Sequence, residues 1–359
     1  VGTYWAANYN VIFRANRVLE NLDVVTDANQ KAQFEGEAKF ARALSHFNLV
    51  RAYGAVPLVD QVIIQTDTAY FGRTDVATVL SFIATDLRTA AGNLANASAS
   101  DAGRATSGAA SGLLAKVMLT QGDYAGAEGV LNGLIAGGEY ALLDEYRDVF
   151  FNEMSGEILF AIPYKDDDAN ESQDFSFEMT IGGAVSGLNF VTDNFKSFAD
   201  PLDTERAAVY YNPNNAVEVG KFLTQSADAR LCGNDWIVLR YADVLLMHCE
   251  AIMAGAASTQ DLDAIASYNL VRERVGLSTL AVDGSETLTK EMLSDERRAE
   301  LAFENHRLYD LIRMGMAETV LGDFATANGF SFQATDLLLP LPQGEINVSA
   351  GRLTQNPGY

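Results

Sequence analysis

The chain has 359 residues, of which 48% are hydrophobic and 20% charged, and its net charge is −23. This composition is that of a folded globular protein and excludes a mostly disordered chain. Because 48 acidic residues oppose only 25 basic ones, the protein repels polyphosphates, which argues against nucleic acid as a partner. No apolar run approaches the ~20 residues that a membrane-spanning helix needs, and the sequence shows no signal peptide.

Neither the start of the chain nor its cysteines indicate the cellular compartment of the protein. Val1 opens the chain inside a segment with a helical pattern, so we expect a processed or truncated product whose targeting signal lies upstream. Cys232 and Cys249 lack the spacing of a metal site. Cys249 lies in an apolar helical pattern, which favours a small buried residue; a disulfide with Cys232 is the alternative.

The first third of the chain predicts three helices. Tyr4–Leu22 is amphipathic, Phe34–Tyr53 is apolar or small almost all round, and Asp75–Leu94 is amphipathic again. The second pattern is typical of a helix that is buried on several sides. Gly54 follows it at the position where glycine commonly ends a helix.

Two later segments predict helical hairpins. Thr106–Thr120 and Tyr124–Ala136 are joined by a short turn around Gly122, and their pattern resembles a tetratricopeptide hairpin, in which small residues let two helices approach closely. A second hairpin-like unit runs from residue 238 to 275 and turns near Gly255. Stacked helical pairs are therefore the expected architecture.

The middle of the chain is different. Glu157–Tyr164 predicts a strand, and Leu337–Leu341 is a weaker strand candidate. Between about residues 165 and 234 the helical period fails, and Asp, Asn, Gly and aromatic residues are frequent. Such a stretch inside a compact chain is usually functional or mobile. The alternative is that its aromatic residues only pack loops onto the helical core.

The segment Ser294–Arg313 combines charged and apolar residues at high density. Helical spacing places Glu300 close to Arg297 and to Glu304, so we expect opposite charges to pair along one side of a helix. This pattern indicates either a salt-bridged structural helix or a family signature. An enzymatic role for its glutamates is the least favoured interpretation.

Motifs of catalysis and metal binding are missing. His46, His248 and His306 lie in helical segments without the partners of a zinc or di-iron site, and no nucleophile elbow or phosphate loop occurs. Asp166–Asp168 could hold calcium, but without the spaced ligands and glycine of a calcium loop a solvated turn is favoured. We therefore expect a protein that is not an enzyme and has no cofactor.

In the irregular region, aromatic rings lie next to amides and carboxylates. This combination suits sugars, because the apolar face of a pyranose stacks on a ring while its hydroxyls bond to Asn, Gln and Asp.

The sequence as a whole resembles one family, the SusD/RagB outer-membrane lipoproteins of Bacteroidetes. Five stretches carry the resemblance, and together they cover nearly the whole chain. In the family's order they are YWAANYNVIFRANRVLENL at Tyr4–Leu22, EAKFARALSHFNLVRAYGAVPLV at Glu37–Val59, NDWIVLRYADVLLMHCEA at Asn234–Ala251, ERRAELAFENHRLYDLIRMG at Glu296–Gly315 and LPLPQGEINVSAGRLTQNPGY at Leu339–Tyr359.

The resemblance implies a mostly α-helical fold with tetratricopeptide-like hairpins and a few short strands. It implies a single SusD-like domain over 1–359, with a helical scaffold at 1–150 and 236–325, a loop-rich, ligand-binding region at 151–235 and a C-terminal extension at 326–359. It further implies a cell-surface lipoprotein that captures oligosaccharides and passes them to a SusC-like, TonB-dependent transporter. The lipid-bearing cysteine is not in this chain, because Cys232 and Cys249 come far too late.

The family's motifs are scaffold motifs, whereas its ligand residues lie in variable loops. The residues that match the motifs are therefore expected to pack and to form ion pairs; they are Tyr241, Asp243, Arg297, Glu300, Glu304, Arg307, Asp310 and Arg313. Candidate ligand residues are chosen by aromatic and polar content alone. They are Tyr70, Phe71, Phe175, Phe177, Asn189, Phe190 and Asp193.

Other functions stay open at this point. A relative of the same fold could carry peptides, and the acidic surface would then favour basic ones. A soluble helical-repeat scaffold that binds only proteins is a second alternative. A glycosidase is the enzymatic alternative, because 48 acidic residues offer many chance carboxylate pairs.

Overall fold

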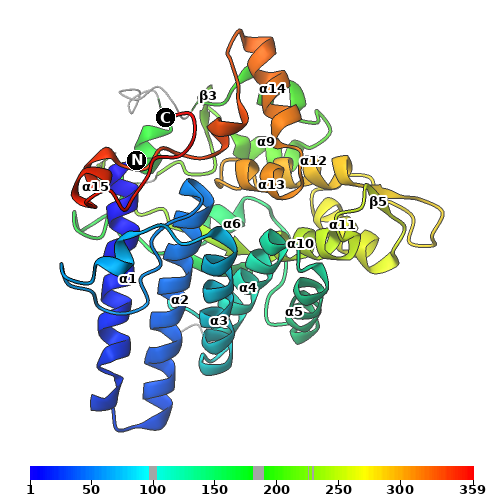
Figure 1. The fold of residues 1–359 in the computed structure, drawn as a ribbon. Coiled ribbons are helices and arrows are strands. Elements are labelled where there is room, and N and C mark those ends of the chain that lie inside the picture. Colours follow the sequence, from blue (N-terminus) through cyan, green and yellow to red (C-terminus); the bar gives the residue numbers. More distant parts are fainter. Residues whose placement is uncertain (97–102, 181–189, 225, 229) are drawn as a thin grey trace. The chain divides into compact units, whose positions relative to one another are not determined.

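The computed structural model describes residues 1–96, 103–180, 190–224, 226–228 and 230–359 (Figure 1). The chain divides into two compact units, which are treated separately below. Unit 1 comprises Val1–Ala97, Arg104–Val130 and Leu308–Tyr359, and unit 2 comprises Ser98–Gly103 and Leu131–Arg307. The single domain over 1–359 stays a prediction.

The regular elements of the described part of unit 1 are helices joined by loops. Its first four helices pack in chain order, α1 on α2, α2 on α3 and α3 on α4, and lie side by side in Figure 1. Its elements are α1 (Gly2–Glu20), η1 (Leu22–Val24), α2 (Ala28–Tyr53), η2 (Thr68–Phe71), α3 (Val76–Asn93), α4 (Ser107–Gln121), α13 (Arg307–Arg313), α14 (Ala317–Asn328), η5 (Ala334–Leu337) and α15 (Gln343–Val348). Helix α5 (Tyr124–Gly137) contains residues of both units, and α13 begins on the last residue of unit 2.

Helix starts in unit 1 follow local capping chemistry. Asp27 accepts a hydrogen bond from the backbone N of Gln30, and Asp75 accepts one from Thr78 N at 2.9 Å. Each cap satisfies a backbone donor that the first helical turn leaves unpaired. Gly54 ends α2 with a φ of 73°, a conformation that glycine adopts without strain.

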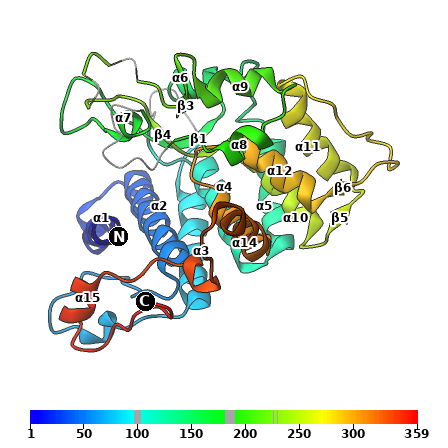
Figure 2. The same cartoon turned by 90° about the horizontal axis from the view of Figure 1, so that it is seen from above.

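Unit 2 combines short helices with small sheets. Its described strands form three two-stranded antiparallel sheets, β1 with β4, β2 with β3 and β5 with β6. Helices α11 and α12 both pack on α10, and α10 and α12 contact strands β4, β5 and β6 (Figure 2). The elements are α6 (Asp148–Phe151), β1 (Ile158–Ile162), α7 (Phe175–Glu178), α8 (Asp193–Phe198), α9 (Thr204–Tyr210), β2 (Tyr211–Asn212), β3 (Asn215–Val219), β4 (Trp236–Arg240), α10 (Tyr241–Met253), β5 (Ser258–Thr259), α11 (Leu262–Arg274), β6 (Leu288–Thr289) and α12 (Lys290–Glu300).

The helices predicted up to residue 275 and the Glu157–Tyr164 strand are confirmed, with ends that differ by a few residues. The strand predicted at Leu337–Leu341 is wrong, because η5 ends at Leu337 and the next residues form no strand. Leu339 N instead donates to Ala52 O at 2.7 Å, so one bond to the end of α2 satisfies it without a sheet partner. Within the described ranges, no helix has both the length and the apolar character that crossing a bilayer requires.

Much of the aromatic content of region 165–234 packs into the core of unit 2. Phe195 and Tyr210 are buried and their ring centroids lie 5.0 Å apart. Phe222 stacks on Trp236 with ring centroids 5.7 Å apart. For these residues the loop-packing interpretation is therefore the correct one.

Candidate functional site

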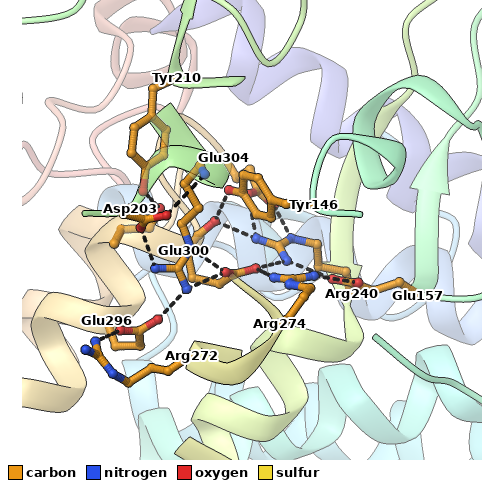
Figure 3. A network of polar contacts seen from close by, with 12 residues as sticks. Tyr146, Glu157, Asp203, Tyr210, Arg240, Arg272, Arg274, Glu296, Glu300 and Glu304 are labelled. Atoms are coloured by element: carbon orange, nitrogen blue, oxygen red, sulfur yellow. Dashed lines mark hydrogen bonds and ion pairs between the residues drawn. The ribbon is translucent and has the colours of Figure 1, made fainter. Parts of the chain in front are cut away.

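A network of buried ion pairs lies inside unit 2 (Figure 3). Its centre is Glu300 at the end of α12, which accepts hydrogen bonds from Arg206 Nε at 2.9 Å and Arg240 Nη1 at 2.5 Å, and also pairs with Arg274. Glu304 accepts from Arg240 Nε at 2.8 Å and from Lys221 Nζ at 2.7 Å. The other residues of the network drawn as sticks in Figure 3 are Tyr146, Glu157, Asp203, Tyr210, Arg272 and Glu296.

The prediction that Ser294–Arg313 forms one helix with charges paired along its side is wrong. Helix α12 ends at Glu300, and the turn that follows holds Phe303 and Asn305 at positive φ values of 67° and 63°. Glu300 at the end of α12 and Glu304 on this turn reach cations from α9, from the segment after β3, from β4 and from α11. A buried carboxylate needs several donors, and cations from other elements can surround it from more directions than one helix face can.

The electrostatics of this network are those of a structural element. Burial raises the pKa of Glu304, but Arg240 and Lys221 outweigh it and bring the pKa to about 2. Burial lowers the pKa of Lys221 to about 8 against the opposing effect of Glu304. Glu300 and Glu304 are buried and engaged by cations, so neither is poised to donate or accept a proton on a substrate.

The other family-motif residues also form internal contacts. Arg297 Nη2 lies 2.8 Å from Asp243 Oδ1 in the buried core, and Arg313 pairs with Asp310 at 2.9 Å. Arg307 Nη1 donates to Ser294 O and Oγ, each at 2.9 Å. The predicted structural role of these charges is therefore confirmed, although most of the partners lie on other elements.

The predicted ligand residues Tyr70 and Phe71 line a cavity of about 310 Å³ in unit 1. Three segments that are distant in sequence form it: the start of α1, the loop before and including η2, and α15 with the residues after it. Its lining residues are Trp5, Ala6, Tyr9, Pro57, Val59, Ile63, Tyr70, Phe71, Glu345, Val348, Ser349 and Leu353.

Internal contacts hold the rings of this cavity. Tyr9 donates its hydroxyl to Pro57 O at 2.8 Å, and its ring centroid lies 4.9 Å from that of Trp5. Burial and a hydrogen bond with Asp60 raise the pKa of Tyr70. Glu345 supplies a carboxylate beside these rings. The cavity thus offers aromatic surface with acceptors at its edge.

The other predicted ligand residues belong to unit 2. Phe175 is half-buried, and its ring makes edge contacts with Phe222 at 5.5 Å and Trp236 at 5.2 Å. Phe177 is half-buried, and the Arg230 guanidinium lies 4.4 Å above its ring.

Two predicted residues flank the start of α8, and one lies outside the described residues. Phe190 is half-buried, whereas Asp193 is exposed at the start of α8 and lies 3.4 Å from Lys196 Nζ. Asn189 lies outside the described residues. The described predictions therefore fall in three segments: Tyr70 and Phe71 in η2, Phe175 and Phe177 in α7, and Phe190 and Asp193 around the start of α8.

Sequence reasoning missed Trp5, Tyr9 and Glu345 as cavity residues. Trp5 and Tyr9 lie in a segment that was predicted only as an amphipathic helix, and nothing local distinguishes a ring that packs from one that lines a cavity. Glu345 reaches the same cavity only because the C-terminal segment lies beside α1. In the described part of the chain, no group of three or more His, Cys, Asp or Glu side chains could hold a metal ion.

Comparison with protein families gives two matches. Residues 200–359 match the SusD family, and residues 1–119 match a family described as starch-binding and associating with the outer membrane. SusD-like protein P25 of Formosa agariphila is 28% identical over all of this chain and 80% of its own length. SusD-like protein P2 of the same organism is 27% identical over all of this chain and 81% of its own length.

Comparison with solved structures also finds SusD-like proteins. A laminarin-binding SusD-like protein superposes with a TM-score of 0.79 at 28% identity, over 99% of this chain and 86% of that one. Surface glycan-binding protein A from Bacteroides fluxus has a TM-score of 0.84 at 24% identity, over 100% of this chain and 85% of that one, and shows the shared fold.

The fold and these relatives define a glycan-binding protein that is not an enzyme and that associates with the outer membrane. The chain belongs to the SusD/RagB family. The predicted family, the mostly α-helical fold and the non-catalytic function are thereby confirmed.

Proposed function

We propose that this protein captures oligosaccharides at the cell surface and passes them to a SusC-like, TonB-dependent transporter, while an N-terminal lipid anchors it to the outer membrane. Family membership and the aromatic cavity of unit 1 support this proposal. The single observation that carries the binding step is that Tyr70 and Phe71 line this cavity beside Trp5 and Tyr9.

The cavity has the chemistry that sugar rings need. Aromatic faces stack on the apolar faces of pyranoses, and carboxylates accept hydrogen bonds from their hydroxyls. We propose Tyr70 and Phe71 as the stacking residues and Glu345 as an acceptor. The remaining predicted residues, Phe175, Phe177, Asn189, Phe190 and Asp193, are proposed as ligand contacts of unit 2.

The glycan class follows from the relatives. The laminarin-binding SusD-like protein is 28% identical to this chain, and the family that matches residues 1–119 is described as starch-binding. Both names refer to neutral glucans. We therefore propose a neutral glucan oligosaccharide as the cargo.

Isothermal titration with laminarihexaose, maltohexaose and a xylogluco-oligosaccharide tests the proposal. We expect micromolar binding of at least one glycan, and Tyr70→Ala or Phe71→Ala should weaken it by about 1–3 kcal/mol, as truncating an anchoring aromatic residue does. Phe330→Ala is the matched control, because Phe330 is 66% exposed in the same unit and does not line the cavity. Flat titrations for all three glycans would contradict the proposal, and binding of basic peptides alone would replace the glycan with a peptide.

Tryptophan fluorescence localises the ligand without a change in the cavity. The sequence has two tryptophans, Trp5 in the unit 1 cavity and Trp236 packed on Phe222 in unit 2. In the Trp236→Phe variant, the remaining signal comes from Trp5 alone. We expect this signal to change with glycan concentration along the same curve as the calorimetric titration.

The transporter step is tested in the native organism. We expect the lipidated protein to co-purify from outer membranes with a TonB-dependent transporter. Recovery of the protein in the membrane fraction without any transporter would contradict this part of the proposal and leave the glycan-binding part intact.

A further inference from the structure

Unit 2 contains a second cavity, of about 440 Å³, that none of the predicted ligand residues lines. It lies where α6 and the residues that follow β1 meet the segment that leads into β4. Its lining residues are Phe150, Phe151, Glu153, Tyr164, Lys165, Asp166, Asp167, Thr224, Ser226, Gly233 and Asn234.

Backbone bonds fix two of the three segments that form this cavity. Lys165 N donates to Glu171 O at 2.8 Å, which closes the turn that holds the acidic triplet. Gln173 and Cys232 exchange two backbone hydrogen bonds of 3.0 and 2.9 Å, which join the segments. A Cβ on Gly233 would lie only 3.2 Å from Asp166 N, so the close approach of the two segments depends on glycine there.

Aromatic rings form the apolar wall. Phe175 makes an edge contact with Tyr164, with ring centroids 6.2 Å apart, and Tyr146 makes one with Phe150 at 5.2 Å. Neighbouring rings thus hold Tyr164 and Phe150 in place before any ligand arrives. Such a prepared ring costs little conformational entropy when a sugar stacks on it.

Hydroxyl and amide groups also line the cavity. Thr224 donates to Ser226 Oγ at 2.9 Å, and Ser226 donates to Asp166 Oδ2 at 3.3 Å, so these groups form a short chain. Ser176 donates to the Asn234 side-chain oxygen at 3.3 Å and orients the amide. Oriented hydroxyls, an amide and carboxylates beside aromatic rings are the groups that bind sugar hydroxyls.

The charge of the cavity is negative. Glu153, Asp166 and Asp167 contribute carboxylates, and the lysine of the described lining, Lys165, pairs with Glu171 at 2.5 Å. Partial burial raises the pKa of Glu153, and Asp235 and Asp166 raise it further, as crowded negative charges do.

The net charge of unit 2 as a whole is also negative. It contains 13 lysines and arginines against 32 aspartates and glutamates, a net charge of −19, whereas unit 1 has 12 against 16, a net charge of −4. Several of the basic residues of unit 2, among them Arg206, Lys221, Arg240 and Arg297, are buried in ion pairs and cannot meet a ligand.

We propose that this cavity binds an uncharged sugar residue of the oligosaccharide and discriminates against sugars that carry carboxylate or sulfate groups. Tyr164 stacks on the sugar ring, Asn234 and Asp166 bond to its hydroxyls, and the three carboxylates repel an anionic substituent. The inference rests on the proposed function and adds to it a second binding site and a selection rule.

The experiment compares laminarihexaose, maltohexaose and xylogluco-oligosaccharide with the same glycans oxidised at C6 to uronates, by isothermal titration at low salt. Wild-type protein should bind the oxidised form at least about tenfold more weakly than the neutral one. Tyr164→Ala should weaken binding of the neutral glycan about tenfold or more. The double variant Asp166→Asn, Asp167→Asn keeps side-chain size and should bring the two affinities to within about threefold.

Two controls separate this cavity from general effects. The double variant Glu205→Gln, Glu273→Gln removes two exposed charges of unit 2 outside the cavity and should leave the preference for neutral glycan unchanged. Thermal denaturation shows that each variant is folded.

The outcomes are distinct. Wild-type affinity in Tyr164→Ala, with binding lost in Tyr70→Ala, overturns the second site and leaves the proposed function standing. An equal loss of selectivity in the control double variant assigns the selection to the charge of the unit and overturns the role of the cavity. Absence of binding to every neutral glycan overturns the proposed function itself.

Discussion

Arg240 Nη1 lies 2.5 Å from Glu300 Oε1, and both side chains are almost completely excluded from solvent. The same guanidinium donates to Glu304 at 2.8 and 2.9 Å and to Glu157 at 2.9 Å. Arg240→Ala would leave these three buried carboxylates short of a counter-charge. We expect it to lower the free energy of unfolding by about 3–5 kcal/mol, measured by urea denaturation.

A surface ion pair provides the matched control for this prediction. Lys31 Nζ lies 2.7 Å from Asp23 Oδ1, but the Asp23 side chain is 97% exposed. Lys31→Ala should therefore cost less than about 1 kcal/mol. If Arg240→Ala also costs less than about 1 kcal/mol, the buried network contributes no more to stability than a surface ion pair does.

His46 should make the stability of the protein fall in mild acid. Its Nδ1 lies 3.0 Å from Arg42 O, and Val59 N donates to its Nε2 at 3.4 Å, which fits the neutral ring. Burial lowers the pKa of His46 from 6.5 to about 4. Between pH 6.5 and pH 4, His46 is therefore protonated in the unfolded chain but neutral in the folded one. The free energy of unfolding falls as the pH drops through this range and becomes constant below it.

The loss from this histidine should be about 2 kcal/mol between pH 8 and pH 5. Urea denaturation over this range, for wild type and His46→Gln, measures it. The variant should be less stable at pH 8 and should lose less stability on acidification. Parallel curves for the two proteins would show that His46 is not the group responsible.

Two helical glycines should respond to alanine in opposite directions. A Cβ on Gly36 in α2 would lie 2.8 Å from Leu94 Cγ, and Leu94 is buried. Gly36→Ala should therefore lower stability by about 1–2 kcal/mol despite its better helix propensity. Gly129 in α5 is exposed and a Cβ there meets nothing within 4 Å, so Gly129→Ala should raise stability by about 0.5–1 kcal/mol. Thermal melts of both variants test the difference in sign.

The two cysteines should be unreactive in the folded protein. Cys232 and Cys249 are buried and form no disulfide with each other, which rules out the disulfide alternative in this structure. Burial raises the pKa of the Cys249 thiol, which suppresses the reactive thiolate. Ellman's reagent should find no rapidly reacting thiol in native protein and two in denaturant; a fast thiol in native protein would show that one of these sites opens.

Local patterns were enough to predict most helices. The Tyr4–Leu22, Phe34–Tyr53 and Asp75–Leu94 patterns correspond to α1, α2 and α3, because periodic burial and capping residues act over a few positions. The weak strand at Leu337–Leu341 failed for the same reason, since a short apolar run has no sheet unless a partner strand lies beside it.

Local sequence patterns could not identify the ion-pair partners and cavity residues that come from distant segments. The spacing of Arg297, Glu300 and Glu304 pointed to pairs within one helix, whereas Glu300 and Glu304 pair with cations that lie 26 to 94 positions away, such as Arg240. Tyr164 was assigned to a strand, and only the meeting of its segment with Asn234 makes it a cavity residue.

The amino-acid sequence alone determined the helical class, the family, the absence of catalytic motifs and the acidic character of this protein, because these depend on composition, on periodicity and on matched motifs. The tertiary structure decided which carboxylates are neutralised inside unit 2 and which rings line the two cavities. The reason is physical: burial and ion pairing depend on distances between segments far apart in the chain, and chain folding alone sets those distances.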